Sequence, residues 1–296
     1  MGLQKILQDI ARHKWDYLFV LPKFAVFVAF IGVPVAWSVF ISFQEFGVFQ
    51  TRWVGLDNFR VAFEDDLFLI ALKNTVWYAL IVMPANVLIA LVLASLIFPL
   101  SRKAQTFFRA AFYLPTVTSA VVIAMAWKYI YQPDVGLLNA FLRMLGASGR
   151  NWLGQSSTAM WSVIMMSILT PPGVGIIMYL AAMGSIPNEI YEAATVDGAS
   201  GFQKWWRITV PLLKPTTLYL VVLGTIGSFQ VFSQIMIMTR GGPGHATKVL
   251  VYLIYETAFR DMEFGLAGAY SLMLFAIIMV FAFIQFKYLN VNLEYY

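Results

Sequence analysis

The sequence of 296 residues contains no cysteine and only two histidines, His13 and His245, which lie far apart in the chain. The missing thiols exclude disulfide bonds, cysteine nucleophiles and cysteine-ligated metal ions. Two distant histidines do not form a histidine metal cluster either. Charged residues are also scarce, at 12% of the chain, whereas an average soluble domain has roughly 25%. The sequence therefore lacks most residue types on which enzymes and soluble surfaces depend.

Apolar residues are what the chain has in excess. They make up 60% of the sequence, and the mean hydropathy is +0.74. A soluble domain has roughly 45–50% apolar residues, and one core of this size cannot hide the surplus. We therefore expect membrane lipid to cover part of the protein.

Six stretches without charged residues approach or exceed the length of about 20 residues that a membrane-spanning helix needs. The first is too long for the apolar part of a secretion signal and no small-residue cleavage site follows it, so we expect a retained helix. We predict an all-α integral membrane protein with a single transmembrane domain over residues 1–296. The predicted spans cover about 18–43, 74–98, 109–130, 158–182, 216–238 and 264–287.

The connecting segments differ in charge. The segment before the second span carries Glu64, Asp65 and Asp66, and the opposite side collects the basic residues. Basic segments stay in the cytoplasm of bacteria, so we expect both chain termini to be cytoplasmic. This bias explains the net charge of +5 without a nucleic-acid partner. The basic residues placed inside include Lys5, Arg12, Arg102, Lys103, Arg109, Lys204 and Arg207.

The cytoplasmic loop 183–214 is the most informative segment. Pro187 suits the first turn of a helix, and Gly198 suits the left-handed turn that ends one. Ser200 and Gln203 predict a capping box at the start of a second helix, which we expect Pro211 to end. The pattern predicts a short helix–turn–helix that either inserts into a cleft of a soluble partner or lies on the membrane without one.

Three motifs in the chain resemble those of a known family. The run EAATVDGA at 192–199, followed after eight residues by ITVP at 208–211, closely resembles the EAA loop of ABC importer permeases, with Val210 in the place of the usual leucine. The segment 238–244 also resembles that family. The segment 127–139 resembles sugar-type members, related to the maltose, arabinose, lactose and glycerol-3-phosphate permeases.

The resemblance implies the type I (MetI-like) importer fold in a bacterial cell membrane, with the loop as a coupling helix that docks on an ATPase. It implies a second, similar permease subunit, two ATP-binding cassette ATPase subunits and an extracellular solute-binding protein as partners. For Asp197, a local cap within the turn is an alternative to a contact. The positions expected to couple to the ATPase are Glu192, Ala193, Ala194, Asp197, Gly198 and Ala199.

The chain itself carries no sequence for ATP chemistry. The stretch 241–248 resembles a phosphate-binding loop in composition alone, because it lacks the Gly-Lys step. We therefore expect no catalytic residue, metal or cofactor here, and ATP with Mg²⁺ on partner subunits. An ion-coupled secondary transporter or channel is the alternative. The predicted spans contain no Asp, Glu or His, although backbone carbonyls alone can bind sodium.

The expected substrate pathway lies in the fourth and fifth spans. The run 171–175 must disturb its helix, and irregular backbone at membrane depth lines cavities. Ser167, Pro171, Ser228 and Gln230 fall near positions that contact sugar in maltose-type members. The alternative is that Ser and Thr hydroxyls bond back to helix carbonyls and that the Pro-Gly run serves packing or gating. The pathway candidates are Ser167, Thr170, Pro171, Thr225, Ser228, Gln230 and Gln234.

Neutral polar side chains in the spans suit a carbohydrate. A phosphorylated substrate needs basic residues, and none lies in the span interiors, which disfavours glycerol-3-phosphate.

Overall fold

The computed structural model describes residues 13–46 and 51–288, so Lys5 and Arg12 lie outside the described residues. Most of the described residues are helical, which confirms the all-α prediction. Contacts divide the chain into two compact units, residues 1–62 with 257–272, and residues 63–256 with 273–296. The single domain over 1–296 stays a prediction.

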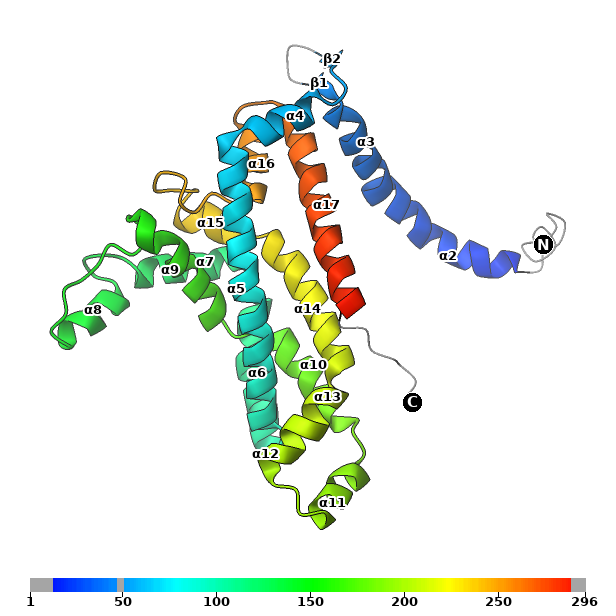
Figure 1. The fold of residues 1–296 in the computed structure, drawn as a ribbon, viewed down its shortest axis with the longest axis vertical. Helices are drawn as coiled ribbons and strands as arrows, with labels where there is room; N and C mark the ends of the chain where they lie inside the picture. The colour runs from blue at the N-terminus through cyan, green and yellow to red at the C-terminus, as the bar shows by residue number, and fades with distance from the viewer. Residues whose placement is uncertain (1–12, 47–50, 289–296) are drawn as a thin grey trace. The chain divides into compact units, whose positions relative to one another are not determined.

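The first unit contains the N-terminal span, a two-stranded sheet and the start of the last helix (Figure 1). The helical span over residues 15–42 buries none of its most apolar window within the protein, as expected for a lipid-facing helix. The Asn58 side chain donates to the carbonyls of Ser42 and Gln44 at 2.9 and 2.8 Å and fixes the turn after the span. The elements are α2 (Lys14–Phe27), the π-helix η1 (Val28–Gly32), α3 (Val33–Ser42), β1 (Gln44–Phe46), β2 (Thr51–Trp53) and most of α4 (Asp57–Glu64).

The strands of this unit are antiparallel, with Glu45 opposite Arg52, and these side chains form an ion pair at 3.3 Å. The first turn of the last helix packs against β1 so closely that only glycine fits at Gly265. A Cβ there would lie within bonding distance of the Gln44 carbonyl oxygen. This sheet therefore connects the N-terminal span to the first turn of the last helix within the unit.

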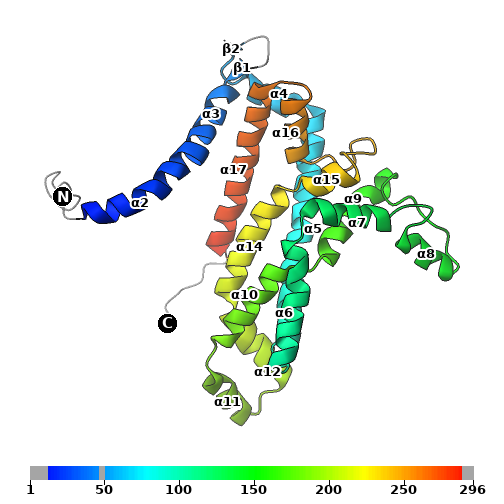
Figure 2. The same ribbon diagram turned by 180° about the vertical axis from the view of Figure 1, so that it is seen from behind.

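The second unit holds the remaining helices, which Figures 1 and 2 show from opposite sides. They are α5 (Asp66–Ile97), α6 (Arg102–Val117), α7 (Ala120–Ile130), α8 (Leu137–Met144), α9 (Ser156–Leu169), α10 (Gly173–Gly184), α11 (Asn188–Val196), α12 (Gly201–Lys204), the π-helix η2 (Trp205–Thr209), α13 (Val210–Leu212), α14 (Lys214–Phe229), α15 (Ser233–Met238), most of α16 (Leu250–Phe259) and the second half of α17 (Phe264–Tyr288).

Helix α5 is the axis of this unit. Its N-terminus is capped by Asp65, whose carboxylate accepts from the Leu67 amide at 2.8 Å, so the helix begins before the predicted span. It packs against α9, α10 and α14. Two buried apolar clusters form along it, one around Ile164 and Ile235 and the other around Tyr179. The helix thus joins two cores that lie at different levels of the unit.

Three of the predicted spans are broken. The third bends by 95° between α6 and α7. The fourth breaks between α9 and α10 at Thr170, Pro171 and Pro172, which confirms the break predicted there. The fifth breaks between α14 and α15, which the sequence analysis did not predict. Among the described residues, five helical segments are long and apolar enough to cross a membrane, and the bent pair makes a sixth, in agreement with the predicted number.

A glycine holds the break in the fourth span in place. A Cβ on Gly173 would lie 2.5 Å from the Phe112 carbonyl oxygen and 2.9 Å from the Tyr113 Cα. The start of α10 therefore packs directly on the backbone of α6, and only glycine permits this approach.

Candidate transport site and coupling loop

A cavity of about 510 Å³ lies within the second unit, where the three broken helices meet α5. Ala120 at the start of α7 lines it, as do Thr170 and Pro172 at the second break and Gln230 and Phe232 at the third. Helix breaks free backbone groups from their ladder. The three helix breaks thus all border the same cavity, as expected for non-helical backbone inside a membrane.

Five of the seven pathway candidates line this cavity, namely Ser167, Thr170, Ser228, Gln230 and Gln234. The other two, Pro171 and Thr225, are not among its lining residues. The Thr225 hydroxyl donates to the Val221 carbonyl at 2.8 Å and accepts from the Gln285 amide at 2.6 Å. It therefore joins α14 to α17 instead of facing the cavity.

Ser167 and Thr170 have their hydroxyl groups engaged within the protein. The Thr170 hydroxyl donates to the Met166 carbonyl at 2.8 Å. The Ser167 hydroxyl donates to the Val163 carbonyl at 3.0 Å and lies 2.7 Å from the Tyr78 hydroxyl. For these two side chains the alternative of back-bonding to helix carbonyls describes the geometry, and Ser167 links α9 to α5.

Ser228, Gln230 and Gln234 differ from that pair. Across residues 13–46 and 51–288, the structure records no hydrogen bond of their side chains. Asn86 and Ser233, which the sequence analysis did not name, also line the cavity, and the Asn86 Oδ1 is buried without a hydrogen-bond partner. No charged side chain is among the lining residues. The cavity therefore offers amides and hydroxyls to a neutral polar ligand.

The loop between α10 and α14 folds as predicted at its centre. Gly198 has a φ of +76°, its amide donates to the Thr195 carbonyl, and the Ala199 amide donates to the Ala194 carbonyl. This is the Schellman pattern that a left-handed glycine permits. Ser200 then caps α12, and the reciprocal bonds with Gln203 form the complete capping box.

The prediction that Pro211 ends the second helix is wrong. The backbone stays helical through Pro211 to Leu212 and continues into α14. The π-helical turn before it explains why, because the Val210 amide bonds to the Trp205 carbonyl, five residues back. The shifted bonding pattern absorbs the missing amide of proline, which then sits in the first turn of α13.

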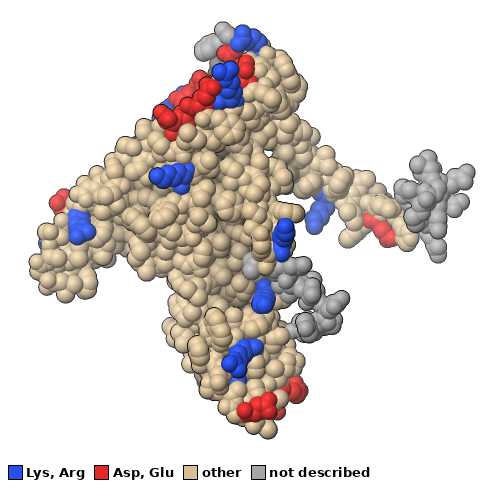
Figure 3. Space-filling model, viewed as in Figure 1, with Lys and Arg blue, Asp and Glu red and all other residues tan. Residues whose placement is uncertain are grey.

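The tip of this loop is exposed. Glu192, Ala193, Asp197 and Gly198 are exposed, and Ala194 and Ala199 are half-buried. Large apolar side chains are exposed beside them, with Val196 at 89% and Phe202 at 72%. Figure 3 shows acidic side chains at this tip. The Asp197 carboxylate makes no hydrogen bond within the described residues, and the cap of the next helix is Ser200.

The base of the loop is bound firmly to the long helices. The Trp205 indole donates to the Ser95 hydroxyl of α5 at 2.8 Å. Tyr191 and Thr209 share a hydrogen bond at 2.9 Å across the loop. Leu213 is buried in the cluster that also holds parts of α5 and α10. The base of the loop is therefore joined by direct contacts to α5, which also lines the cavity.

The segment 131–153 forms a loop, α8 and a second loop. A Cβ on Gly136 would collide with the Ile130 and Gln132 carbonyl oxygens. The buried Asn139 side chain donates to the Pro133 and Arg150 carbonyls and accepts from the Arg150 amide and the Trp152 indole. The Gly and Asn of the motif at 127–139 are therefore explained by folding of this loop.

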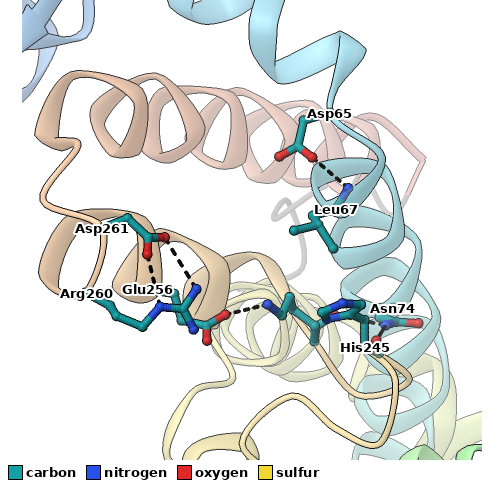
Figure 4. Close-up of polar contacts among 8 residues, drawn as sticks. Asp65, Leu67, Asn74, His245, Glu256, Arg260 and Asp261 are labelled. Carbon is teal, nitrogen blue, oxygen red and sulfur yellow. Dashed lines mark hydrogen bonds and ion pairs between the residues drawn. The ribbon is translucent and has the colours of Figure 1, made fainter.

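A buried ion pair lies after the fifth span. Lys248 and Glu256 pair with side chains that are 6% and 10% exposed. The Asn74 amide of α5 donates to the carbonyls of His245 and Lys248 at 3.1 and 2.9 Å (Figure 4). No sequence pattern predicts this pairing, because ion pairs along a helix join residues three or four apart and these two charges are eight apart. The two Asn74 hydrogen bonds join the loop before α16 to the first half of α5.

Comparison with known proteins places the chain. Residues 86–290 match the family model described as "Binding-protein-dependent transport system inner membrane component". The chain is 38% identical over 283 residues to the probable ABC transporter permease protein YurN of Bacillus subtilis (strain 168), covering 94% of this chain and 97% of that protein. It is 30% identical over 293 residues to the sn-glycerol-3-phosphate transport system permease protein UgpA of Escherichia coli (strain UTI89 / UPEC), covering 97% and 98%.

Two solved structures of ABC transporters have the same fold as this chain. The fold matches a chain in a crystal structure of a bacterial alginate ABC transporter in complex with alginate pentasaccharide-bound periplasmic protein, with a TM-score of 0.84, 25% identity and coverage of 95% of each chain. A second structure, of a bacterial ABC transporter involved in the import of the acidic polysaccharide alginate, gives a TM-score of 0.85 at 25% identity and covers 98% of this chain and 100% of that one.

These matches decide against the alternative of an ion-coupled transporter or channel. They agree with the resemblance seen in the loop at 192–211, and with a cavity and an exposed loop on one set of helices. The chain belongs to the inner membrane component family of binding-protein-dependent transport systems and is a permease subunit of an ABC importer.

Proposed function

We propose that this permease subunit carries a neutral carbohydrate, a sugar or an oligosaccharide, through the cavity between its broken helices. An extracellular solute-binding protein delivers the substrate, and a second permease subunit forms the other wall of the pathway. The observation that carries the proposal is the lining of the cavity, which combines unpartnered amide and hydroxyl side chains with no charged group.

The charge of the cavity bears on the substrate class. Relatives carry names that refer to sn-glycerol-3-phosphate and to the acidic polysaccharide alginate. An anionic substrate held in an apolar setting needs a basic partner, and no Lys or Arg is among the lining residues here. A polyhydroxylated neutral ligand has no such requirement. This supports a neutral sugar over a phosphorylated or carboxylated one.

Two ATP-binding cassette subunits supply the energy, with ATP and Mg²⁺ bound entirely on them. Support comes from the exposed loop tip, where Val196 and Phe202 present apolar surface beside Glu192. Such side chains gain by burial in a partner groove. Glu192 makes charge-assisted hydrogen bonds there, and Ala193, Ala194, Asp197, Gly198 and Ala199 shape the contact.

In this proposal the loop and the cavity are coupled mechanically. When the ATPases close on ATP, the loop tip moves with them, and Trp205 and Leu213 carry the movement to α5 and the neighbouring helices. Those helices line the cavity at their other end. The subunit thereby alternates between inward-facing and outward-facing states, and hydrolysis resets it.

The orientation follows from charge. Arg102 and Lys103 open α6 next to the end of α5, which Trp205 of the loop also contacts. This end therefore collects basic residues, as cytoplasmic ends do. The proposal places the loop and both termini in the cytoplasm of a bacterial cell.

The test is uptake by the assembled complex, in which this subunit is expressed together with its second permease, ATPase and binding-protein partners. Uptake of labelled maltose, lactose, raffinose and glycerol 3-phosphate is measured in whole cells. The proposal expects ATP-dependent uptake of at least one neutral sugar and none of glycerol 3-phosphate. Preference for glycerol 3-phosphate over all sugars would contradict it.

The cavity is tested with Ser228→Leu and Gln230→Leu combined. We expect uptake of the sugar to fall at least about tenfold, because two hydrogen-bonding groups are lost. Gln155→Leu, at an exposed position outside the cavity lining, is the matched control and should transport normally. Unchanged uptake of every sugar by the double variant would remove these residues from the pathway.

A further inference from the structure

The second predicted span contributes a polar side chain to the cavity. Asn86 of α5 lines it, and its Oδ1 atom is buried with no hydrogen-bond partner in the described part of the chain. The pathway residues predicted from the sequence all lie on the fourth and fifth spans. Asn86 therefore adds a third helix to the polar lining.

Close packing fixes where Asn86 lies. One turn before it, Met83 touches α14, because a Cβ on Gly224 would lie 3.1 Å from the Met83 Cγ. One turn after it, Ala90 touches α10, because a Cβ on Gly175 would lie 3.0 Å from the Ala90 Cβ. Asn86 sits between these two contacts on the same face of α5. The facing helices bring glycines here, so they leave room beside the amide.

The Asn86 Oδ1 atom needs a hydrogen-bond donor that the described part of the chain does not supply. A buried carboxamide oxygen without a donor is unfavourable, and native structures rarely keep one without a reason. An amide offers an acceptor and two donor hydrogens, and a sugar hydroxyl is the complementary group because it both donates and accepts. The absence of charged lining residues makes a neutral hydroxyl the fitting partner.

Asn86 belongs to α5, whereas the other free polar groups of the cavity, Ser228, Gln230, Ser233 and Gln234, belong to the segment from α14 to α15. Gln230, Ser233 and Gln234 cluster at the break between α14 and α15, whereas Asn86 lies near the start of α10 and the middle of α14. A ligand that reaches both groups is held at two points on different helices. Contact at two points distinguishes sugars that differ in the spacing and stereochemistry of their hydroxyl groups.

We infer that Asn86 is a specificity-determining residue that binds a hydroxyl group of the carbohydrate from the α5 side of the cavity. The inference rests on the proposed function, since it names a contact for the same substrate class. The residue sits outside every motif that identified the family, and its role follows from the orphaned oxygen and the two glycine contacts beside it.

The experiment compares three variants in the assembled complex with its binding protein. Asn86→Leu keeps the size and removes all hydrogen bonding. Asn86→Ser keeps a hydroxyl that can still donate and accept. Leu88→Ala, at a position that is 59% exposed on the outer face of α5, is the control. Initial uptake rates are measured for maltose, lactose and raffinose over a range of concentrations, together with the ATPase rate without sugar.

We expect Asn86→Leu to lower uptake of the preferred sugar at least about tenfold and to change the order of preference among the three sugars. Asn86→Ser should recover part of the loss, and the ATPase rate without sugar should match that of Leu88→Ala. A purely structural role would lower uptake of all three sugars equally together with the protein level in the membrane, and this result overturns the inference.

Failure of the two proposals gives different results. If the unaltered complex takes up none of these sugars, the proposed function is wrong and the inference falls with it. If the unaltered complex takes up a sugar and Asn86→Leu does so with the same affinity and preference, the inference alone is wrong.

Discussion

The loop at 183–214 and the cavity depart from ordinary burial in opposite ways: the loop exposes apolar side chains, and the cavity encloses polar ones. The loop over α11 and α12 displays apolar side chains, with Val196 and Phe202 largely exposed, and needs another protein to cover them. The cavity encloses polar side chains, with Ser228 and the Asn86 oxygen buried, and needs a ligand to satisfy them. In each region a feature that departs from ordinary burial rules is the ground on which we propose that a partner acts there.

The two regions also differ in how they are stabilised. The loop is built from local interactions, the Schellman turn at Gly198 and the capping box at Ser200, each within a few residues. The cavity is built from contacts between distant segments, such as Tyr78 with Ser167 and Gly173 with Phe112. Substitutions in the loop should therefore affect coupling, and substitutions around the cavity should affect both folding and selectivity.

The largest effect is expected from Glu192→Lys. A positive charge at the tip opposes the contact with the ATPase, and breaking a buried interfacial charge contact reduces its strength about thirtyfold or more. We expect sugar uptake by the complex to be lost while the protein level in the membrane stays normal. Asp134→Lys, at an exposed position far along the sequence from the loop, is the control. Normal uptake by Glu192→Lys would contradict the docking role of this residue.

An intermediate effect is expected from Gly198→Ala. The φ of +76° disfavours a residue with a Cβ by about 1 kcal/mol, so a fraction of the molecules should lose the angle between α11 and α12. We expect the uptake rate to fall about fivefold with an unchanged apparent affinity for sugar. Gly201→Ala, which has no atom within 4 Å of its Cβ position and no positive φ, should behave normally. An equal loss in both variants would show that the turn has no special role.

The smallest effect on transport is expected from Ser167→Ala. Its hydroxyl is bonded to the Val163 carbonyl and to Tyr78, so it stabilises packing of α9 on α5. We expect a loss of stability of about 1 kcal/mol, measured by thermal unfolding in detergent, and an uptake affinity within about twofold of normal. Ser228→Ala should show the reverse pattern. A selective loss of sugar affinity in Ser167→Ala would return this residue to the binding site.

The features predicted from sequence are those encoded locally. The number of spans, the glycine turn, the capping box and the break at Pro171 each depend on a few neighbouring residues. The break after Phe229 was missed because the residues there, Gln230 to Phe232, carry no proline or glycine. The continuation through Pro211 was missed because the π-helical turn that permits it has no clear sequence signal.

Of the pathway residues, the sequence identified the polar side chains in two spans, but it could not show which hydroxyls are already satisfied. Thr225 is engaged by Gln285, sixty positions later, and Ser167 by Tyr78. Asn86 was missed for the same reason, since its importance depends on glycines in two other helices. Such facts arise only when distant segments come together.

The central claim, that the exposed loop docks on an ATPase, is tested most directly by crosslinking. The chain has no cysteine, so Val196→Cys at the tip introduces a single thiol, and Val135→Cys, 58% exposed in the loop before α8, serves as the control. A short thiol–amine crosslinker is applied to the complex in native membranes. The account predicts a product of Val196→Cys that contains a nucleotide-hydrolysing subunit and changes in yield with ATP. A product equal to that of Val135→Cys, or none that contains an ATPase, would contradict it.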